Sequence, residues 1–328
     1  MVSKFTLSAS ALAVFAMVLL PHAKVQAQPY PSRPVTWVVP SPAGGVTDLS
    51  ARVIAKTLSA KIGQPVIVDP RPGAGGIVAT EFVAGAKPDG YTLLYATSGT
   101  IATNPWIYKK LSYDSFKSFA PIHTLHEASP ILVVPASSPF KTVDDLVSYA
   151  RAHPEKINFA SAGAGTGQHF AFELFRSAAN FQATHVPYRG STPALTDLTG
   201  GVVDVAFEYY SPLKTLLEAG KLRALAVTGS RRSPVMKDTP TLVELGYPSA
   251  VWSGWSTVVA PAGTPANVID DLVKAFAEVM QAPEVVAYIE STGSQPLPFQ
   301  AKEGVEAFHR AESEKVRRLV EAAGITVE

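Results

Sequence analysis

Short apolar runs alternate with amphipathic stretches along the first third of the chain. The runs at 35–39, 65–69 and 91–97 are continuous and bounded by turn residues, which predicts three buried strands. Between them, apolar residues recur at helical spacing, which predicts two helices, the second over 75–86. Strands joined in this β-α-β-α-β order form right-handed crossovers, so the pattern predicts a parallel sheet covered by helices.

The same alternation begins again near residue 130. Five strand-like runs are separated by four helical segments. Thr142 is predicted to cap the first of these helices, with Asp144 and Asp145 in its first turn, near the positive end of the helix dipole. The predicted strands cover 130–136, 157–161, 183–188, 202–208 and 222–229, and the predicted helices cover 142–154, 166–180, 192–201 and 212–221.

The last part of the chain has one strand-like run, 255–261, followed by helical segments at 265–281, 283–291 and 302–323. One strand cannot form a sheet of its own, so these segments are expected to return to the first sheet. The chain then crosses twice between two α/β lobes, which makes a hinge with a cleft beside it. The predicted lobes comprise residues 28–127 with 250–328, and residues 128–249.

Residues 1–27 have the pattern of a secretory signal peptide. Lys4 gives a positive start, residues 9–20 are apolar, and Val25 and Ala27 are small residues at the cleavage positions. The apolar run is shorter than the roughly 20 residues of a membrane-spanning helix. We therefore predict cleavage after Ala27 and export. The chain has no cysteine, which excludes disulfides, a thiol nucleophile and a lipid-bearing cysteine and fits a periplasmic location.

Charge and motif content narrow the possible functions. The net charge is +1 without a long basic or acidic block, which argues against a nucleic-acid partner. A nucleophile elbow (G-x-S-x-G), a Walker A loop and a dinucleotide fingerprint are all missing from the sequence. His123 and His126 have the spacing of metal ligands but no accompanying acidic motif. We therefore predict no metal and no cofactor.

The sequence PSPAGGVTDLSAR, residues 40–52, connects the first predicted strand to the first predicted helix. Its small residues allow a ligand to approach the backbone, and the helix N-terminus offers N–H groups and the positive end of a dipole. A plain turn with Thr47 or Asp48 as the helix cap is the alternative. The candidate binding residues here are Pro42, Ala43, Gly44, Gly45, Thr47 and Asp48.

Later loops have related compositions. FASAGAGTGQHF, residues 159–170, repeats the order of strand, small-residue loop and helix, so two anion-binding loops could hold one ligand from both sides. The candidates in this loop are Ser161, Ala162, Gly163, Gly165, Thr166 and His169, and those after the third strand are Ser98, Gly99 and Thr100. Further strand ends place Tyr188, Arg189, Glu208 and Tyr209 at the cleft, with packing or surface roles as the alternative.

Seven motifs then carry a family resemblance. They are PSPAGGVTDLSAR, RPGAGG (71–76), KPDGYTLLYATSGT (87–100), SAGAGTGQH (161–169), VPYRGSTPALTDLTGGVVDVAFE (186–208), GKLRALAVTGSRRSP (220–234) and APAGTP (260–265). In this order, and over essentially the whole mature chain, the sequence resembles the Bug family of periplasmic solute receptors. These are the extracytoplasmic binding components of tripartite tricarboxylate transporters.

The resemblance implies a two-lobe, Venus-flytrap periplasmic binding protein. Family members bind organic acids such as dicarboxylates, tricarboxylates, acidic amino acids and aromatic carboxylates. In the family a carboxylate lies between the first-lobe loop and the second-lobe loop, partly held by ordered waters, which implies this role for the candidates of both loops. The implied partners are a large and a small membrane subunit and, for some members, a sensor kinase. Ser41 stands where the family commonly has an aromatic residue, and Glu208 where Asp is frequent.

The sequence leaves three functions open. The first is capture of a small organic acid and its delivery to a secondary transporter, without chemistry. The second is a periplasmic hydrolase or lyase that uses Ser98, Ser161 and His169 in the same cleft, although no pattern designates a general base. The third is a ligand-loaded partner of a sensor kinase.

The aromatic side chains expected near the cleft favour a flat or partly apolar ligand body; they are Tyr188, Tyr209 and Trp106. Asp48 is interpreted as capping a helix or as holding a water or an amino group.

Overall fold

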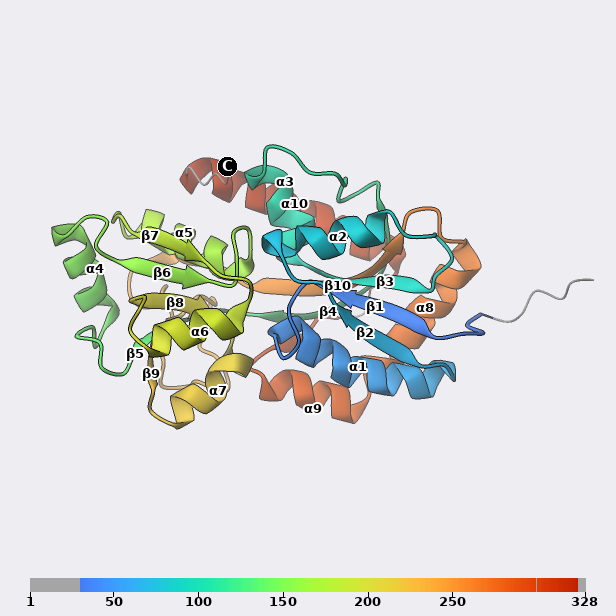
Figure 1. Ribbon diagram of the computed structural model, residues 1–328, viewed down its shortest axis with the longest axis horizontal. Helices are drawn as coiled ribbons and strands as arrows, with labels where there is room; N and C mark the ends of the chain where they lie inside the picture. The colour runs from blue at the N-terminus through green and yellow to red at the C-terminus, as the bar shows by residue number, and fades with distance from the viewer. Residues whose placement is uncertain (1–29, 299, 324–328) are drawn as a thin grey trace, which may run out of the picture.

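The computed structural model describes residues 30–298 and 300–323. The predicted signal peptide and its cleavage site lie outside these residues. Two lobes lie side by side along the longest axis of the molecule, one built on a six-stranded sheet and the other on a five-stranded sheet (Figure 1). The α/β two-lobe fold that the sequence predicts is therefore confirmed, while the residue-level lobe boundaries stay a prediction.

The first lobe contains a mixed sheet with the strand order β11-β4-β10-β3-β1-β2. Strand β1 pairs in parallel with β2 and β3, as the first three predicted strands indicate. The sheet as a whole is mixed, because β10 enters from the other lobe and pairs antiparallel with β3 and β4. The strands are β1 (Val35–Val39), β2 (Val66–Pro70), β3 (Thr92–Thr97), β4 (Phe119–Ala128), β10 (Gly254–Pro261) and β11 (Gln295–Pro296).

Strand β4 is an element that the apolar pattern does not predict. Its sequence, FAPIHTLHEA, interrupts apolar residues with a proline and with polar side chains. His123, Thr124 and His126 are buried, and hydrogen bonds from nearby strands reach this segment. Thr257 Oγ1 donates to the His123 carbonyl at 2.8 Å, and the Tyr95 hydroxyl lies 2.8 Å from His126 Nε2. Hydrogen bonds to residues of other strands therefore help to hold this strand, which lacks a regular apolar pattern.

Alternation along β1 shows why the first sheet is covered on both faces. Val35, Trp37 and Val39 pack in one buried cluster with α1, α8 and α9, whereas Val38 packs on the opposite face with α2 and α10. The predicted helix over 75–86 begins with a 3₁₀ turn, and its α-helical part is shorter. The helical segments are α1 (Val46–Ile62), η2 (Ala74–Gly76), α2 (Ile77–Ala84), the π-helical η3 (Gly99–Thr103), α3 (Asn104–Ile107), α8 (Ala266–Val279), α9 (Pro283–Ser291) and α10 (Lys302–Ala323).

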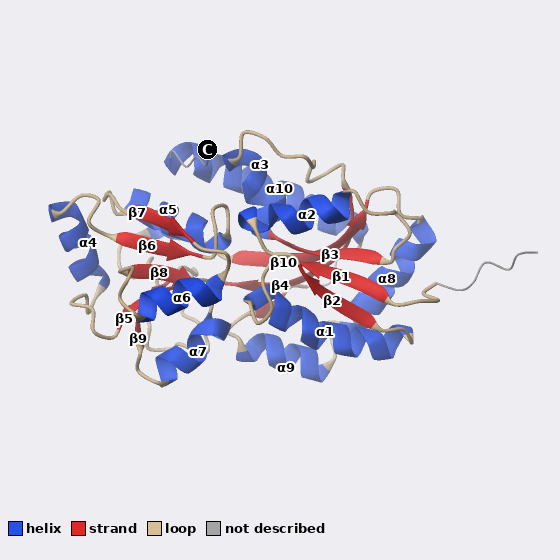
Figure 2. Cartoon of the chain, viewed as in Figure 1, coloured by secondary structure: helices blue, strands red, loops and turns tan. Residues whose placement is uncertain are grey.

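The second lobe is built on a sheet with the order β7-β6-β8-β5-β9, in which β6 is parallel to its neighbours and β5 is antiparallel to them. Helices pack on both faces of this sheet (Figure 2). Thr142 caps α4 in a capping box with Asp145, as predicted. The elements are β5 (Ile131–Pro135), α4 (Val143–Ala152), β6 (Asn158–Ser161), α5 (Gly167–Ala178), β7 (Thr184–Pro187), α6 (Ser191–Thr199), β8 (Val205–Glu208), α7 (Tyr210–Glu218), β9 (Leu222–Val227) and η4 (Pro248–Ala250).

Two short segments connect the lobes. The chain leaves the first sheet after β4 and returns to it at β10, and these two strands are paired neighbours. At the crossing, Ser129 Oγ and Ser253 Oγ lie 2.9 Å apart within hydrogen-bonding distance. Within residues 30–298 and 300–323, no helix is long and apolar enough to cross a bilayer, and no three His, Asp or Glu side chains gather as a metal site would require.

Candidate ligand-binding site

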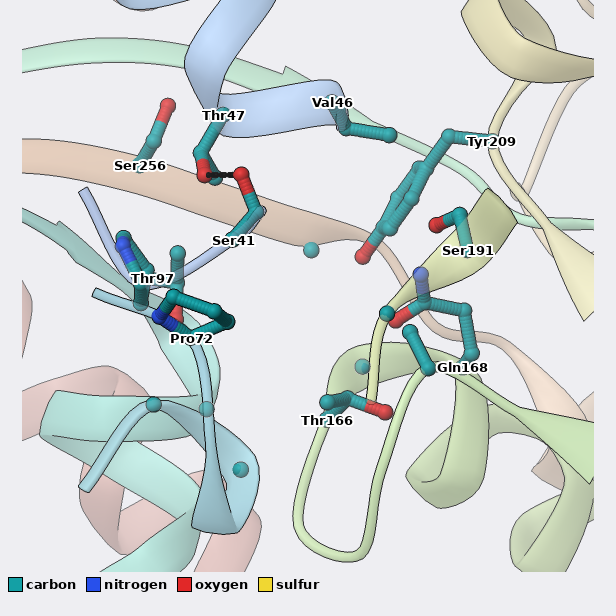
Figure 3. A pocket seen from close by; sticks show the side chains of 18 of the residues that line it. Ser41, Val46, Thr47, Pro72, Thr97, Thr166, Gln168, Ser191, Tyr209 and Ser256 are labelled. Carbon is teal, nitrogen blue, oxygen red and sulfur yellow. Dashed lines mark hydrogen bonds between the residues drawn. The ribbon is translucent and has the colours of Figure 1, made fainter. Parts of the chain in front are cut away.

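A cavity of about 150 Å³ lies between the lobes (Figure 3). Most of its lining comes from segments that follow β1, β2, β3, β6, β7 and β8. Ligands of parallel α/β sheets bind at such carboxyl ends of strands. In Figure 3, Ser41 and Thr47 from the first lobe face Thr166, Gln168 and Tyr209 from the second across this space.

Four helix N-termini meet at this cavity, in addition to that of α2, whose N-cap Gly76 also lines it but donates its own N–H to the Gly73 carbonyl at 2.9 Å. The lining includes Val46 at the start of α1, Gly167 at the start of α5, Ser191 at the start of α6, and Tyr209, the N-cap of α7. The first N–H groups of a helix lack acceptors within the helix, and each N-terminus carries a partial positive charge. Among the described residues that line the cavity, none is Asp or Glu, and Arg189 alone carries a formal charge. The cavity therefore favours an anion.

Polar side chains hold the first loop, which we define as residues 40–45. Ser41 Oγ accepts hydrogen bonds from Thr47 Oγ1 at 2.6 Å and from the Asp48 N–H at 3.2 Å. The Asp48 carboxylate is buried, accepts a hydrogen bond from the Gly44 N–H at 2.8 Å and pairs with Arg52 at 2.9 Å. These contacts fix the loop and the first turn of α1 as one unit.

Of the predicted residues in this region, Pro42 and Thr47 line the cavity, while Ala43, Gly44, Gly45 and Asp48 do not. The idea that Thr47 or Asp48 caps α1 is wrong, because the N-cap is Gly45 and no side chain caps it. A Cβ atom at Gly45 would lie 2.9 Å from Ser41 Cβ, so the glycine lets the loop fold back tightly. Asp48 instead holds Gly44 and Arg52, which gives its carboxylate a structural role.

The loop after β3 contributes Ser98 and Gly99 to the cavity lining. Thr100 does not line it, because its hydroxyl donates to the Thr97 carbonyl at 3.1 Å and accepts from the Thr97 N–H at 3.0 Å. Trp106 also lies away from the cavity, and its Nε1 donates to Ser313 Oγ on α10 at 2.9 Å. The interpretation of Thr100 and Trp106 as ligand contacts therefore finds no support in their positions.

In the second loop, which we define as residues 161–166, Ala162 and Thr166 line the cavity. Thr166 is the N-cap of α5. Its Oγ1 accepts from the His169 N–H at 3.5 Å and donates to the Gly163 carbonyl at 2.7 Å. The other predicted residues of this region, Ser161, Gly163, Gly165 and His169, do not line the cavity.

Glycines of the second loop instead permit close contact with the first lobe. A Cβ atom at Gly165 would lie 2.5 Å from Asn104 Oδ1, and one at Gly75 would lie 2.1 Å from the Ala164 carbonyl oxygen. The Tyr108 hydroxyl donates a hydrogen bond to the same carbonyl at 2.9 Å. Side chains at either glycine position would therefore keep the lobes apart.

Ser161 and His169 are directed into the second lobe. Ser161 Oγ lies 2.7 Å from His185 Nε2, and the rings of His169 and His185 stack with centroids 4.1 Å apart. Burial, with a smaller contribution from Arg176, lowers the pKa of His169 to about 4, and burial lowers that of His185 to about 3. Such histidines are poor general bases at neutral pH. The sequence analysis did not single out His185, which lies on the exposed edge strand β7.

Around α6 and α7, Tyr188 and Tyr209 line the cavity, whereas the predicted residue Glu208 lies behind the lining with 2% of its surface exposed. Glu208 Oε1 accepts hydrogen bonds from Gln168 Nε2 at 3.0 Å and from the Tyr209 N–H at 2.8 Å. Burial raises the pKa of Glu208, and hydrogen bonds from Ser191, Tyr209 and Gln168 oppose that rise.

Sequence reasoning missed several lining residues. Gln168 and Ser191 occupy the first turns of α5 and α6, so the N-terminus reasoning applied to Thr47 would have found them. Tyr95 and His126 come from β3 and β4 and lie on the first-lobe side. Burial lowers the pKa of His126 to about 4 and raises that of Tyr95 to about 12, so both are neutral at pH 7.

Two α/β lobes, joined by two crossings and enclosing a small cavity at four helix N-termini, define a two-lobe solute-binding protein. Residues 50–325 match the family described as TctC, the tripartite tricarboxylate transporter family receptors. The chain belongs to this family and is a Bug-type periplasmic solute-binding protein.

Relatives of known sequence and structure agree with this assignment. Protein BugT of Bordetella pertussis is 36% identical over 276 residues, which cover 84% of this chain and 85% of BugT. The periplasmic binding protein BugD has a TM-score of 0.87 and 32% identity, over 91% of this chain and 100% of BugD. Rpa4515 of R. palustris with adipate has a TM-score of 0.86 and 35% identity, over 90% and 99% of the two chains. MatC of Rhodopseudomonas palustris with bound malate has a TM-score of 0.85 and 31% identity, over 89% and 100%.

Proposed function

We propose that this protein captures a small organic acid through its carboxylate between the two lobes and delivers it to a tripartite transporter with a large and a small membrane subunit. The observation that carries the proposal is the convergence of four helix N-termini on a cavity whose described lining contains no Asp or Glu. Backbone N–H donors suit reversible carriage, because they hold a carboxylate without a buried ion pair.

The nature of the anion is supported by two structural relatives. Rpa4515 has been solved with adipate and MatC with malate, and both ligands are small carboxylates. Membership of the transporter receptor family supports delivery as the purpose of binding. An enzymatic role is disfavoured by the buried Ser161 hydroxyl, whose histidine partner has a strongly lowered pKa.

Contacts between the two lobes support a closed, ligand-bound form of the receptor. Gly75, Gly165 and the Tyr108 hydrogen bond to Ala164 bring the second loop against the first lobe. A ligand that touches α1 in one lobe and α5 in the other binds the closed form more tightly than the open form. This difference in affinity is what shifts the lobes toward closure.

A thermal-shift screen with mono-, di- and tricarboxylic acids, followed by calorimetry, tests capture. A ligand at about 100 times its dissociation constant stabilises the folded protein by about 2.7 kcal/mol, which raises the melting temperature by several degrees. Uncharged amides of the same acids serve as controls and are expected to give no shift. If no carboxylic acid shifts the transition, the proposal is wrong.

Delivery and export are tested in the native host. Deletion of the gene is expected to abolish uptake of the radiolabelled acid that binds in vitro, and restoring the gene to recover it. Mass spectrometry of the periplasmic protein is expected to show a mature chain that starts at Gln28. Unchanged uptake would contradict delivery, and a retained Met1 would contradict cleavage.

A further inference from the structure

The buried carboxylate of Glu208 determines which way the Gln168 side-chain amide faces. Glu208 Oε1 accepts two hydrogen bonds, from the Tyr209 N–H at 2.8 Å and from Gln168 Nε2 at 3.0 Å. A backbone N–H can only donate, so this oxygen is an acceptor. The carboxylate form of Glu208 has no proton to donate, so the Gln168 atom that faces the same oxygen is the NH₂ group.

With its nitrogen turned to Glu208, Gln168 presents its amide oxygen to the cavity. Figure 3 shows the nitrogen of Gln168 directed toward Ser191 and Tyr209 and the oxygen directed into the space between the lobes. Gln168 as a whole is 6% exposed, and this oxygen is the part of its amide that faces the cavity. A ligand that encloses this oxygen and carries an N–H or O–H group can donate to it, whereas a ligand without such a group leaves the acceptor to a water or unpaired.

This acceptor lies within the anion-binding turn itself. Gln168 is the second residue of α5, so the first-turn N–H groups of α5 and the Gln168 amide oxygen belong to one turn. When a ligand carboxylate binds those N–H groups, the ligand atoms next to the carboxylate lie near the Gln168 amide oxygen. This oxygen repels a ligand lone pair and attracts a ligand N–H or O–H group. The second lobe thus combines an anion site with an acceptor beside it.

Two hydroxyl groups of the lining are already donors to the protein. Thr166 Oγ1 donates to the Gly163 carbonyl, and Thr47 Oγ1 donates to Ser41 Oγ. Ser41 Oγ accepts from both Thr47 and the Asp48 N–H, which leaves its own proton to be donated. The first lobe therefore presents a donor at Ser41, whereas the second presents an acceptor at Gln168.

We propose that this receptor selects carboxylic acids that carry a hydroxyl or amino group close to the carboxylate, and that Gln168, oriented by Glu208, is the residue that selects them. The inference rests on the proposed function, because it assumes that an organic acid occupies the cavity. Gln168 is a specificity-determining residue in this account, and Glu208 is a positioning residue.

Calorimetry with pairs of acids that differ by one donor group tests the inference. Suitable pairs are lactate with propionate, alanine with propionate, malate with succinate, and mandelate with phenylacetate. For pairs that bind, the wild-type protein is expected to favour the hydroxy or amino acid by about tenfold or more. When the acid without the hydroxyl or amino group is bound, a water can still reach the Gln168 amide oxygen. The expected ratio of the two dissociation constants is therefore well below the largest ratios that a single lost hydrogen bond can produce.

Two variants separate specificity from stability. Gln168→Met has a similar size but no acceptor, and we expect the affinity ratio within each pair to fall to about one. Glu208→Gln allows the Gln168 amide to face either way, so the ratio is expected to fall severalfold while the fold is kept. Gln281→Met, at an exposed position of the first lobe, is the matched control and should keep the wild-type ratio. Thermal unfolding of each variant reports folding separately from the ratio.

The outcomes distinguish the two proposals. If acids bind but the wild-type protein treats both members of each pair alike, the inference on selection is wrong and capture of carboxylates stands. A ratio that survives in Gln168→Met, or in Glu208→Gln should Gln168→Met fail to fold, overturns the role of Gln168. If no acid binds at all, the proposed function is wrong and the inference is wrong with it.

Discussion

The first loop and the second loop have nearly the same sequence design and different structural roles. Each follows a strand, consists of small residues and ends at a helix N-terminus. In the first, side-chain contacts of Ser41 and Asp48 hold the backbone within its own lobe. In the second, Gly165 contacts the opposite lobe, while His169 is stacked inside its own lobe. Similar local sequences therefore make one loop held by side chains of its own lobe and one loop whose glycines allow close contact with the opposite lobe, while both loops contribute to the cavity lining.

Substitution of one glycine in each loop gives the largest expected difference. Gly44 and Gly165 have φ angles of 79° and 80°, so alanine strains both backbones by about 1–2 kcal/mol. Only Gly165→Ala adds a clash, at 2.5 Å from Asn104 Oδ1, whereas a Cβ atom at Gly44 has nothing within 4 Å among the described residues. We expect Gly165→Ala to lower ligand affinity by about ten- to a hundredfold.

Calorimetry with the best acid from the screen measures this effect, and Gly44→Ala is the matched control for backbone strain. The control is expected to lose stability to denaturant by a similar amount but to lose little affinity. Equal losses of affinity in the two variants would show that the second loop does not act through contact between the lobes.

Removing the buried carboxylate of the first loop is expected to have the next largest effect. Asp48→Ala leaves the Gly44 N–H without its acceptor and removes the pair with Arg52. We expect the free energy of unfolding to fall by about 1–3 kcal/mol in urea titrations. Asp144→Ala, at an exposed first-turn position of α4, is the control and should cost less than about 1 kcal/mol. Equal losses of unfolding free energy in Asp48→Ala and Asp144→Ala would contradict the structural role of the Asp48 carboxylate in the first loop.

The stacked histidines make the second lobe sensitive to acid. The pKa of His169 is about 4 in the folded protein, and its ordinary value is about 6.5, so the unfolded chain binds more protons between these values. Stability is therefore lost as the pH falls from about 6.5 toward about 4. From pH 7 to 5, His169 alone accounts for about 1–2 kcal/mol.

Urea titrations at pH 7 and pH 5 measure this loss in the wild-type protein and in His169→Gln. The variant is expected to lose less stability on acidification, while the exposed His153→Gln should behave like the wild type. An unchanged acid sensitivity in His169→Gln would assign the effect to other groups.

The smallest expected effect on ligand affinity comes from Arg189. Arg189 is exposed, and among the described lining residues it is the only one with a formal charge. Exposed charges contribute about 0.2–1 kcal/mol, so Arg189→Gln should weaken binding by at most about fivefold at low salt and hardly at all at high salt. Arg231→Gln, another exposed second-lobe position outside the lining, is the control. A large, salt-independent loss would show that the carboxylate depends on an ion pair.

The two loops also illustrate which features of the fold and the site could be predicted from the sequence. Hydrophobic alternation gave the strands and helices whose apolar residues are regular, and small-residue loops located the two sides of the cavity. The apolar pattern missed strand β4 because polar residues interrupt it, and contacts that hold them, such as that of His126 with Tyr95, come from residues distant in the sequence. Ser161 and His169 were expected at the ligand, but their direction depends on His185, which lies far along the chain. Gln168 depends in the same way on Glu208.

The pairing of β4 with β10 has a mechanical consequence. Both connections between the lobes leave from these two neighbouring strands, and Ser129 and Ser253 bring the connections side by side. Both connections therefore start from one place in the first sheet and do not tie the lobes together at two separate points. Connections that lie side by side favour rotation of the lobes about one axis, and the close approach of Gly165 to Asn104 is the contact at which such a rotation would stop.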